Sequence, residues 1–529
     1  MTAHVPDQHR ARPSGRAGRR EWIGLAVLVL PCLLVSMDVS VLLFAMPFIS
    51  ADLAPSGTQL LWIMDMYGFV LAGMLITMGA LGDRIGRRRL LLIGAAAFSA
   101  ASVAAAYSTS AAMLIATRAG LGLAGATLMP STLALIRNLF HDAAQRKTAI
   151  AVWTGAITGG VTVGPIIGGL LMDHFWWGSA FLINLPAMVL LLVLGPVLLP
   201  EFRKPAAGRF DLLGSLLSLG AVLPVVYGIK ELAVDGYAPR PVLAIIVGLV
   251  LGGLFWYRQR TAAHPLIDLT LFRNRTYGTA VGVNMVTNFA MLGFSLYTMQ
   301  YLQVVKGMSP LVASLWSLSV MPFIMVAMTV AGVAAKKARP AYVIAAGLAL
   351  SACGLAITTQ VQVHQSLAVV LTGAGLLAAG MLVATSLTAD LILAAAPPEQ
   401  AGAASAVSET GSELGGALGF AILGSIGTAV YHHQMADVRE PGLSAQTLRA
   451  ARDTLGSAAH VPGDAGQALL ETAKTAFTHG LNATGLAGAI VLTVAALLTL
   501  AVLRDVPPAT SEGGLQDAAD QQATVHLAG

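Results

Sequence analysis

Charged residues are scarce in this chain: only 11% of its 529 residues are Asp, Glu, Lys or Arg, whereas soluble domains carry about 25%. Cysteine is scarcer still, because Cys32 and Cys353 are the only two and lie in separate apolar stretches. This excludes a disulfide framework and a cysteine-based metal site. The sequence also lacks a phosphate-binding glycine loop, a metal-ligand spacing and a catalytic constellation. We therefore expect no metal, no cofactor and no enzymatic activity.

Long apolar runs take the place of the missing charge: 56% of the residues are hydrophobic and the mean hydropathy is +0.74. The first run, from Trp22 to about Phe44, is too long for a cleavable signal peptide. A helix needs roughly 20 apolar residues to cross a bilayer, and the sequence predicts an all-α integral membrane protein with fourteen such helices. They begin near residues 22, 60, 89, 111, 148, 178, 211, 241, 278, 309, 341, 366, 403 and 480.

Basic residues predict the orientation of these spans. With the N-terminus inside, only seven of the 31 Lys and Arg residues fall in outside segments, among them Lys230 and Lys306. Positive charge marks the cytoplasmic side, so both termini are expected in the cytoplasm of a multi-pass protein of a bacterial cytoplasmic membrane. This rule accounts for the net charge of +5, and no nucleic-acid partner is expected.

The spans group as six, two and six. An internal sequence repeat indicates two related halves: the segment from Thr77 resembles the segment from Thr329, with Ala335 in the place of Asp83. Transporters built from such repeats bind their substrates between the halves. We predict a cytoplasmic tail over 1–21, a six-helix bundle over 22–200, two inserted helices over 201–260, a cytoplasmic linker over 261–277, a second six-helix bundle over 278–503 and a cytoplasmic tail over 504–529.

One long excursion, residues 431–479, is expected outside the cell within the second bundle. It contains two helical-looking stretches, Ser444–Ala458 and Gly466–Thr478. It is either a spacer or a lid that shapes the outer exit.

Two glycine-rich segments indicate moving parts. The turn GALGDRIGRRR, from Gly79, combines flexible glycines with an acid that can reach a helix N-terminus or pair with arginines, which makes it a candidate latch. The fifth span reads GAITGGVTVGPIIGG from Gly155, so one face lacks side chains and allows a neighbouring helix to pack closely and pivot. The residues assigned to conformational change are Gly79, Asp83, Arg84, Gly86, Arg87, Gly160, Gly164, Pro165, Gly168 and Gly169.

Four acids, Asp38, Asp65, Glu409 and Glu413, lie in or at the mouth of apolar spans. A charge in hydrocarbon costs at least about 2.5–3.5 kcal/mol, so these acids are functional candidates. Arg118 is a lone arginine deep in the fourth span, and it cannot lose its proton. It therefore needs an acidic partner, for which Asp38 is the candidate.

The other three acids suggest cation binding. Glu409 and Glu413 are four residues apart, so they share a helix face and are expected to titrate as a unit, exchanging a proton for a cation. The alternative is a structural pair facing polar groups or water. Asp65 has Trp62 and Phe69 on its face, which suits a lipophilic cation; a solvated acid in an interfacial aromatic belt is the alternative.

These segments resemble a known family. The turn from Gly79, the helix from Gly155, MDVSVLLFAMP from Met37, LLWIMDMYGFVLAG from Leu60 and AVSETGSELGGALG from Ala406 are similar to those of the fourteen-helix drug:proton antiporters of the major facilitator superfamily, especially Qac/Smv-type exporters. The resemblance implies proton coupling through Asp38, Arg118, Glu409 and Glu413. It implies substrate binding through Trp62, Asp65, Phe69, Glu409 and Glu413.

The expected function is export of lipophilic cationic drugs, antiseptics and dyes in exchange for protons. A functional monomer embedded in the lipid bilayer is expected to carry it out. A dedicated exporter of one antibiotic or secondary metabolite is the alternative; Glu409 and Glu413 would then matter less than Asp38 and Arg118. A proton-coupled importer is disfavoured by the glycine pattern of the fifth span.

Overall fold

A computed structural model describes residues 17–504 and 506, except 141, 204–210, 236, 263–270, 336–337, 365, 396–400 and 442. This part of the chain is helical, as predicted, because only helices and closed barrels satisfy every backbone hydrogen bond inside lipid. The first bundle consists of α1 (Arg19–Leu53), α2 (Gly57–Ile85), α3 (Arg87–Ala106), α4 (Ala111–Leu139), α5 (Ala143–His174), α6 (Ser179–Leu182) and α7 (Leu185–Leu198). Next come α8 (Leu212–Asp235) and α9 (Pro239–Thr261).

The remaining helices begin at residue 271. They are η1 (Leu271–Arg273), α10 (Arg275–Gln300), η2 (Tyr301–Val305), α11 (Pro310–Ser317), η3 (Leu318–Val320), α12 (Met321–Ala334), α13 (Pro340–Thr358), α14 (Ala368–Ala395), α15 (Ala401–Met435), α16 (Ala445–Asp453), α17 (Leu455–Ala459) and α18 (Asp464–Leu503).

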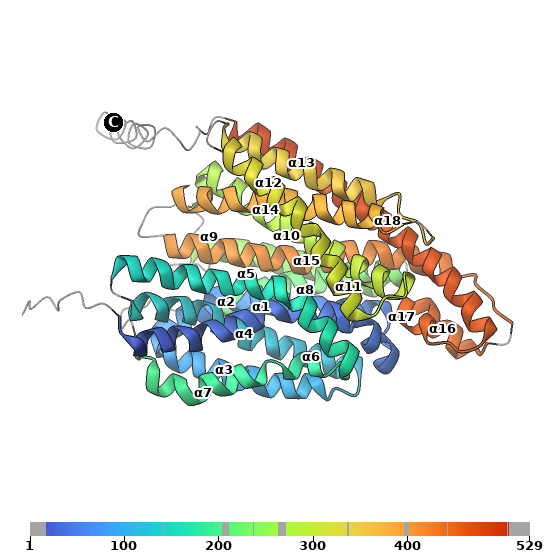
Figure 1. The fold of residues 1–529 in the computed structure, drawn as a ribbon, viewed down its shortest axis with the longest axis horizontal. Helices are drawn as coiled ribbons and strands as arrows, with labels where there is room; N and C mark the ends of the chain where they lie inside the picture. The colour runs from blue at the N-terminus through green and yellow to red at the C-terminus, as the bar shows by residue number, and fades with distance from the viewer. Residues whose placement is uncertain are drawn as a thin grey trace, which may run out of the picture.

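The long helices run side by side along one axis (Figure 1). We call the end where α1 begins and α18 finishes the terminal end, and the opposite end, which carries α16 and α17, the loop end. Helices α1 to α7 pack mainly on one another, as do α10, α12, α13, α14, α15 and α18. The two groups meet where α2 packs on α15, α1 on α10, and α5 on α11.

Thirteen of the described helical segments are long and apolar enough to cross a membrane. Some of them combine two helices, such as α6 with α7 and α11 with α12. Helix α5, which has 32 residues, is a fourteenth helix of comparable length. Local signals explain several starts: the Ser56 side chain accepts a hydrogen bond from the backbone of Gln59, and Ser110 and Asp142 cap α4 and α5.

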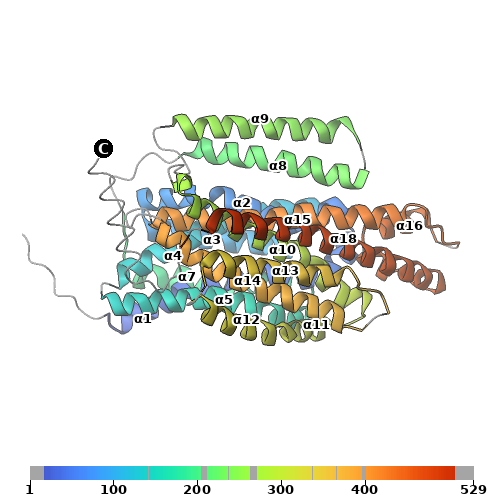
Figure 2. The same ribbon diagram turned by 90° about the horizontal axis from the view of Figure 1, so that it is seen from above.

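Helices α8 and α9 form a hairpin on one side of the molecule, with α9 outermost (Figure 2). Helix α8 packs on α2 and α15. Near its start, the hydroxyl groups of Thr77 and Ser215 hydrogen bond to each other, and a Cβ on Gly73 of α2 would meet Leu219 of α8. The hairpin is therefore seated against both bundles through α8.

The excursion over 431–479 differs from its predicted form. Helix α15 continues to Met435, and the first predicted stretch is present as α16 and α17. The second, Gly466–Thr478, is no separate helix, because α18 runs without a break for 40 residues from Asp464. Its buried residues Leu469, Ala473 and Phe477 lie on the same side as those of the membrane-spanning part, and this continuity of packing extends the helix. The linker stretch 263–270 lies outside the described residues.

Candidate functional site

The predicted partner of Arg118 is confirmed: Nη1 forms an ion pair with Oδ2 of Asp38. The two side chains are 0% and 1% exposed. Nε of the same guanidinium donates a hydrogen bond to the carbonyl of Ile63 at 3.1 Å, and Cζ lies 4.7 Å from the centre of the Tyr67 ring. Arg118 thus connects α4 to α1 and α2 through one buried charge. The proton-coupling role of the pair stays a prediction.

Asp65 also has a basic partner, which sequence analysis missed. Nζ of Lys230 on α8 lies 2.7 Å from Oδ2 of Asp65 and 3.8 Å from the centre of the Trp62 ring. Both charged side chains are 0% exposed. The prediction that Lys230 belongs to an outside segment is therefore wrong. Its helix continues to Asp235, and packing of α8 on α2 turns the side chain into the protein.

The rest of the predicted aromatic face is also covered. Phe69 is buried with Val226 of α8 and Ala417 of α15, and its ring centre lies 6.5 Å from that of Trp62. The face predicted for substrate is therefore filled in this structure by side chains of the inserted hairpin and of α15. Its role in binding substrate stays a prediction.

Glu409 and Glu413 lie on α15 without a basic partner among the described residues. Glu409 is exposed and Glu413 is half-buried. Helix α15 packs on α2, and Glu413 lies at this contact, since a Cβ on Gly68 of α2 would lie 3.8 Å from its backbone oxygen. The two helices approach closely nearby, since a Cβ on Gly68 would lie 3.2 Å from that of Ala417.

A polar group from α10 flanks the two glutamates. Nδ2 of Asn284 donates to the hydroxyl oxygens of Ser408 and Ser412, at 3.1 and 2.7 Å. This network holds the backbone turn between Glu409 and Glu413 against α10. The carboxylates project from a braced helix, and the acids keep no hydrogen-bonded counter-charge among the residues described.

The turn between α2 and α3 closes through ion pairs. Gly86 has a φ of +115°, which favours glycine. Of the two expected partners for Asp83, the structure selects arginine: Oδ1 lies 2.8 Å from Nη2 of Arg87. Arg84 is exposed. Glu201 adds a contact that sequence analysis missed, because Oε2 lies 3.7 and 3.8 Å from Nε of Arg88 and Arg89.

The glycines of α5 fit two neighbours. A Cβ on Gly160, Gly164 or Gly168 would meet α1, at Leu33, Ser40 and Val41 respectively. Gly169 instead faces α11, where a Cβ would lie 2.7 Å from Cα of Leu311. The predicted close packing of a neighbouring helix on the glycine face of α5 is thus observed, and that helix is α1. Gly169 places α5 against α11 of the other bundle at the loop end.

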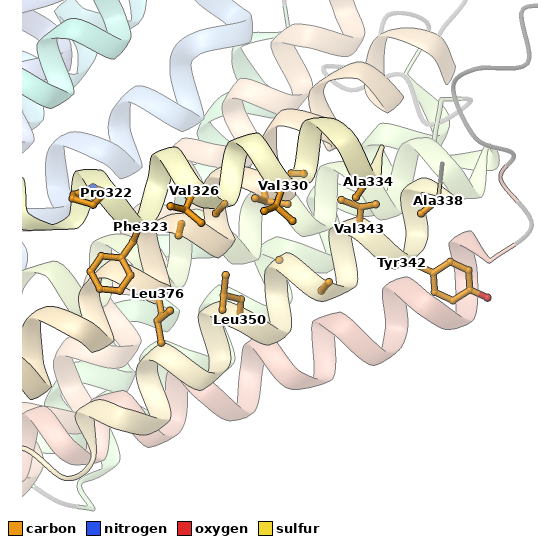
Figure 3. A pocket seen from close by; sticks show the side chains of 16 residues that line it. Pro322, Phe323, Val326, Val330, Ala334, Ala338, Tyr342, Val343, Leu350 and Leu376 are labelled. Atoms are coloured by element: carbon orange, nitrogen blue, oxygen red, sulfur yellow. The ribbon is translucent and has the colours of Figure 1, made fainter. Parts of the chain in front are cut away.

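An apolar groove lies elsewhere on the molecule. It measures about 700 Å³ and is formed by α12, α13 and α14 (Figure 3). Its described lining carries no charged side chain and includes Val326, Val330 and Leu376; the first two are 66% and 62% exposed. An outward apolar groove on a membrane protein faces lipid, so it is not a site for charged cargo. Among the described residues, no cluster suited to a metal ion occurs.

In the described part of the chain, two helical bundles and an inserted hairpin enclose buried ionisable groups, an arrangement typical of a polytopic membrane transporter. The model of the Major Facilitator Superfamily matches residues 28–420. The chain belongs to this superfamily, and both the predicted family and the predicted fold are confirmed.

Known exporters are similar over almost the whole chain. The multidrug efflux pump LfrA of Mycolicibacterium smegmatis is 42% identical, over 92% of this chain and 98% of the pump. The methyl viologen resistance protein SmvA of Salmonella typhimurium is 39% identical, over 87% and 93%. The tetracenomycin C resistance and export protein of Streptomyces glaucescens is 30% identical, over 94% and 93%.

Among solved structures, the chain is similar in fold to a bacterial homologue of the human lysosomal transporter Spinster, in an inward-facing, unoccupied conformation. The TM-score is 0.62 at 17% identity, over 92% of this chain and 98% of that one.

Proposed function

We propose that this protein is a proton-coupled antiporter that exports lipophilic cations, such as quaternary ammonium antiseptics and dyes. The observation that carries the proposal is the pairing of the four intramembrane acids. Asp38 and Asp65 are neutralised by basic residues, whereas Glu409 and Glu413 have no such partner in the described part of the chain. The glutamates therefore offer negative charge that a proton or a cation can neutralise in turn.

The chemistry follows from competition for this charge. Two carboxylates one helical turn apart repel each other when both are ionised. Binding one positive charge relieves this repulsion and is therefore favourable. A cation that enters displaces the proton, and a proton that arrives from outside displaces the cation. The proton gradient supplies the work, at about 2.3 kcal/mol per charge for each 100 mV.

The Asp38–Arg118 pair suits a switch between the two conformations. When Asp38 takes up a proton it loses its attraction for Arg118, whose charge is permanent. Among the described residues, its remaining direct contacts are then the carbonyl of Ile63 and the ring of Tyr67. These groups lie on α2, which also packs on α15. Protonation of Asp38 would therefore change the contacts of a helix at the interface of the bundles.

The proposed placement is a multi-pass protein of the bacterial cytoplasmic membrane with the terminal end in the cytoplasm. The exposed arginines Arg84 and Arg89 lie at this end, as the positive-inside rule requires. We also propose that one chain suffices, because all four acids lie within it. The predicted division into 22–200, 201–260 and 278–503 remains part of this proposal.

Everted membrane vesicles loaded with a pH-sensitive dye test the proposal. After energisation, ethidium or benzalkonium should release protons. Glu409→Gln should reduce this release at least about tenfold, because one lost charge interaction of 1.4 kcal/mol changes an equilibrium by that factor, and Asp38→Asn should abolish it. Glu471→Gln is the matched control, because that acid is 53% exposed and lies outside the site. Wild-type release by both site variants would contradict the proposal.

The alternative, a dedicated exporter of one antibiotic, has support in the similarity to the tetracenomycin C export protein. The same vesicles separate the two. A neutral antibiotic should still be transported by Glu409→Gln if the alternative holds, while ethidium should release no protons from the wild type.

A further inference from the structure

Lys230 occupies a position that a lysine rarely holds. Its ammonium is strongly hydrated in water, yet the side chain is completely buried. Its polar contact is the Asp65 carboxylate at 2.7 Å, and its aromatic contact is the Trp62 ring at 3.8 Å. No further hydrogen-bond partner for Nζ or for either Asp65 oxygen is found in the described ranges.

This environment has the chemistry of a binding site for an organic cation. A carboxylate supplies Coulomb attraction, an indole face supplies cation–π attraction, and Phe69 with Val226 supplies apolar surface. The ammonium of Lys230 is itself a cation on an apolar stem. The protein thus fills a cation site with a cation of its own.

Helix α8 is held in place on α2, whereas the Lys230 side chain is itself flexible. Helix α8 is fixed on α2 by the bond between Thr77 and Ser215 and by the fit of Leu219 against Gly73. Lys230, by contrast, carries its charge on a flexible four-carbon stem. Exchange of one positive charge for another at Asp65 would then require this side chain to move.

We propose that Lys230 is a built-in competitor of the cargo: its ammonium occupies the site formed by Asp65 and Trp62, and a lipophilic cation must displace it to bind there. The inference rests on the proposed export of cations and names a specificity-determining residue for it. Hydrated inorganic cations gain no apolar contact in exchange for the broken ion pair, so they are rejected. A lipophilic cation buries its apolar groups against Phe69 and Trp62 and displaces the lysine.

Binding to the purified full-length protein in lipid nanodiscs tests this. The probes are ethidium, followed by fluorescence, and tetraphenylphosphonium, followed by equilibrium dialysis. Lys230→Met should tighten binding about tenfold or more, because a competing state that is populated nine-tenths of the time lowers the apparent affinity by that factor. Asp65→Asn combined with Lys230→Met should abolish the gain.

Two further variants keep the test decisive. Lys230→Gln retains a hydrogen-bond donor for Asp65 without the charge and should also tighten binding, so it replaces Lys230→Met if that variant does not fold. Arg258→Met is the matched control, because Arg258 pairs with Asp211 within the same hairpin, 2.7 Å apart, and its loss should leave binding unchanged. Unchanged or weaker binding by folded Lys230→Met and Lys230→Gln would show a structural ion pair and overturn the inference.

The result is separable from that of the vesicle experiment. Tighter binding by Lys230→Met in a protein that releases no protons would refute antiport and support the role of Lys230. Proton release with no gain in binding would do the reverse.

Discussion

Replacing Asp38 by leucine should destabilise the folded protein by about 3–5 kcal/mol, the usual cost of leaving a buried charge without its partner. The structure places Arg118 at the high end of this range. Its side chain is 0% exposed, and its other direct contacts among the described residues are a carbonyl and an aromatic ring; the nearby acid Asp65 is already paired with Lys230. Because arginine cannot shed its proton, the folded state cannot neutralise Arg118 by deprotonation.

Replacing the partner instead, by Arg118→Met, should lower the free energy of unfolding by less, because the Asp38 left behind can neutralise itself by taking up a proton. The double variant Asp38→Leu with Arg118→Met removes both charges, and apolar replacement of a buried pair is often close to neutral. We therefore expect a favourable coupling energy of about 2–3 kcal/mol between the two sites. The double variant should be more stable than Asp38→Leu alone, yet inactive in transport.

Unfolding by a denaturing detergent in mixed micelles measures these free energies for the four proteins of the cycle. Lys474→Met is the control for loss of an exposed pair: its partner Glu471 is 53% exposed, so the cost should not exceed about 1 kcal/mol. Additive effects of Asp38→Leu and Arg118→Met would refute the argument, since the two side chains would then not share one electrostatic interaction.

Two further predictions concern the moving parts. Gly164→Leu should lower the stability of the folded protein by about 1–3 kcal/mol through overpacking, because its Cβ would lie 2.9 Å from that of Ser40. The control is Gly155→Leu on the same helix, where a Cβ would meet nothing within 4 Å, and its stability should stay within about 0.5 kcal/mol of wild type. Equal losses of stability in thermal unfolding would contradict the α1–α5 contact. Asp83→Asn should lower stability by no more than about 1 kcal/mol, because the pair with Arg87 is partly exposed. It should nevertheless reduce the drug resistance of cells that express the protein. Unchanged resistance at equal expression would show that the turn is no latch.

The spans and the Asp38–Arg118 pair could be predicted from the sequence because lipid restricts the options so strongly. A span must be long, apolar and helical, and an arginine that cannot deprotonate must find an acid. Few intramembrane acids exist in this chain, so Asp38 was an obvious partner for Arg118. The same scarcity of charge made the four acids stand out. Their pairing, however, depends on which helix faces which.

Lys230 shows where such reasoning stops. A lysine near the end of an apolar helix ordinarily extends its charge to the membrane surface, and YGIKELAVD follows that pattern. Only the packing of α8 on α2 decides that the side chain turns inward. One signal was available: Lys230 follows an apolar stretch directly, and Asp65 is an acid near the outer end of its own helix with which it could pair. The extent of α18 was missed for a related reason, since buried and lipid-facing apolar residues look alike in sequence.

The distribution of charge along α2 and α15 bears on how tightly cargo is held. Asp38 and Asp65 are already neutralised by Arg118 and Lys230, so an arriving cation meets net attraction from Glu409 and Glu413, within the described residues, and from Asp65 only after Lys230 has moved. A site that binds must also release, and four free carboxylates in apolar surroundings would bind a cation too strongly to let it go. In the proposed antiport, Arg118 and Lys230 would lower the affinity to a level that a proton gradient can reverse. If the proposal for Lys230 holds, the inserted hairpin belongs to the site, because without Lys230 the Asp65 carboxylate would hold an exported cation too tightly.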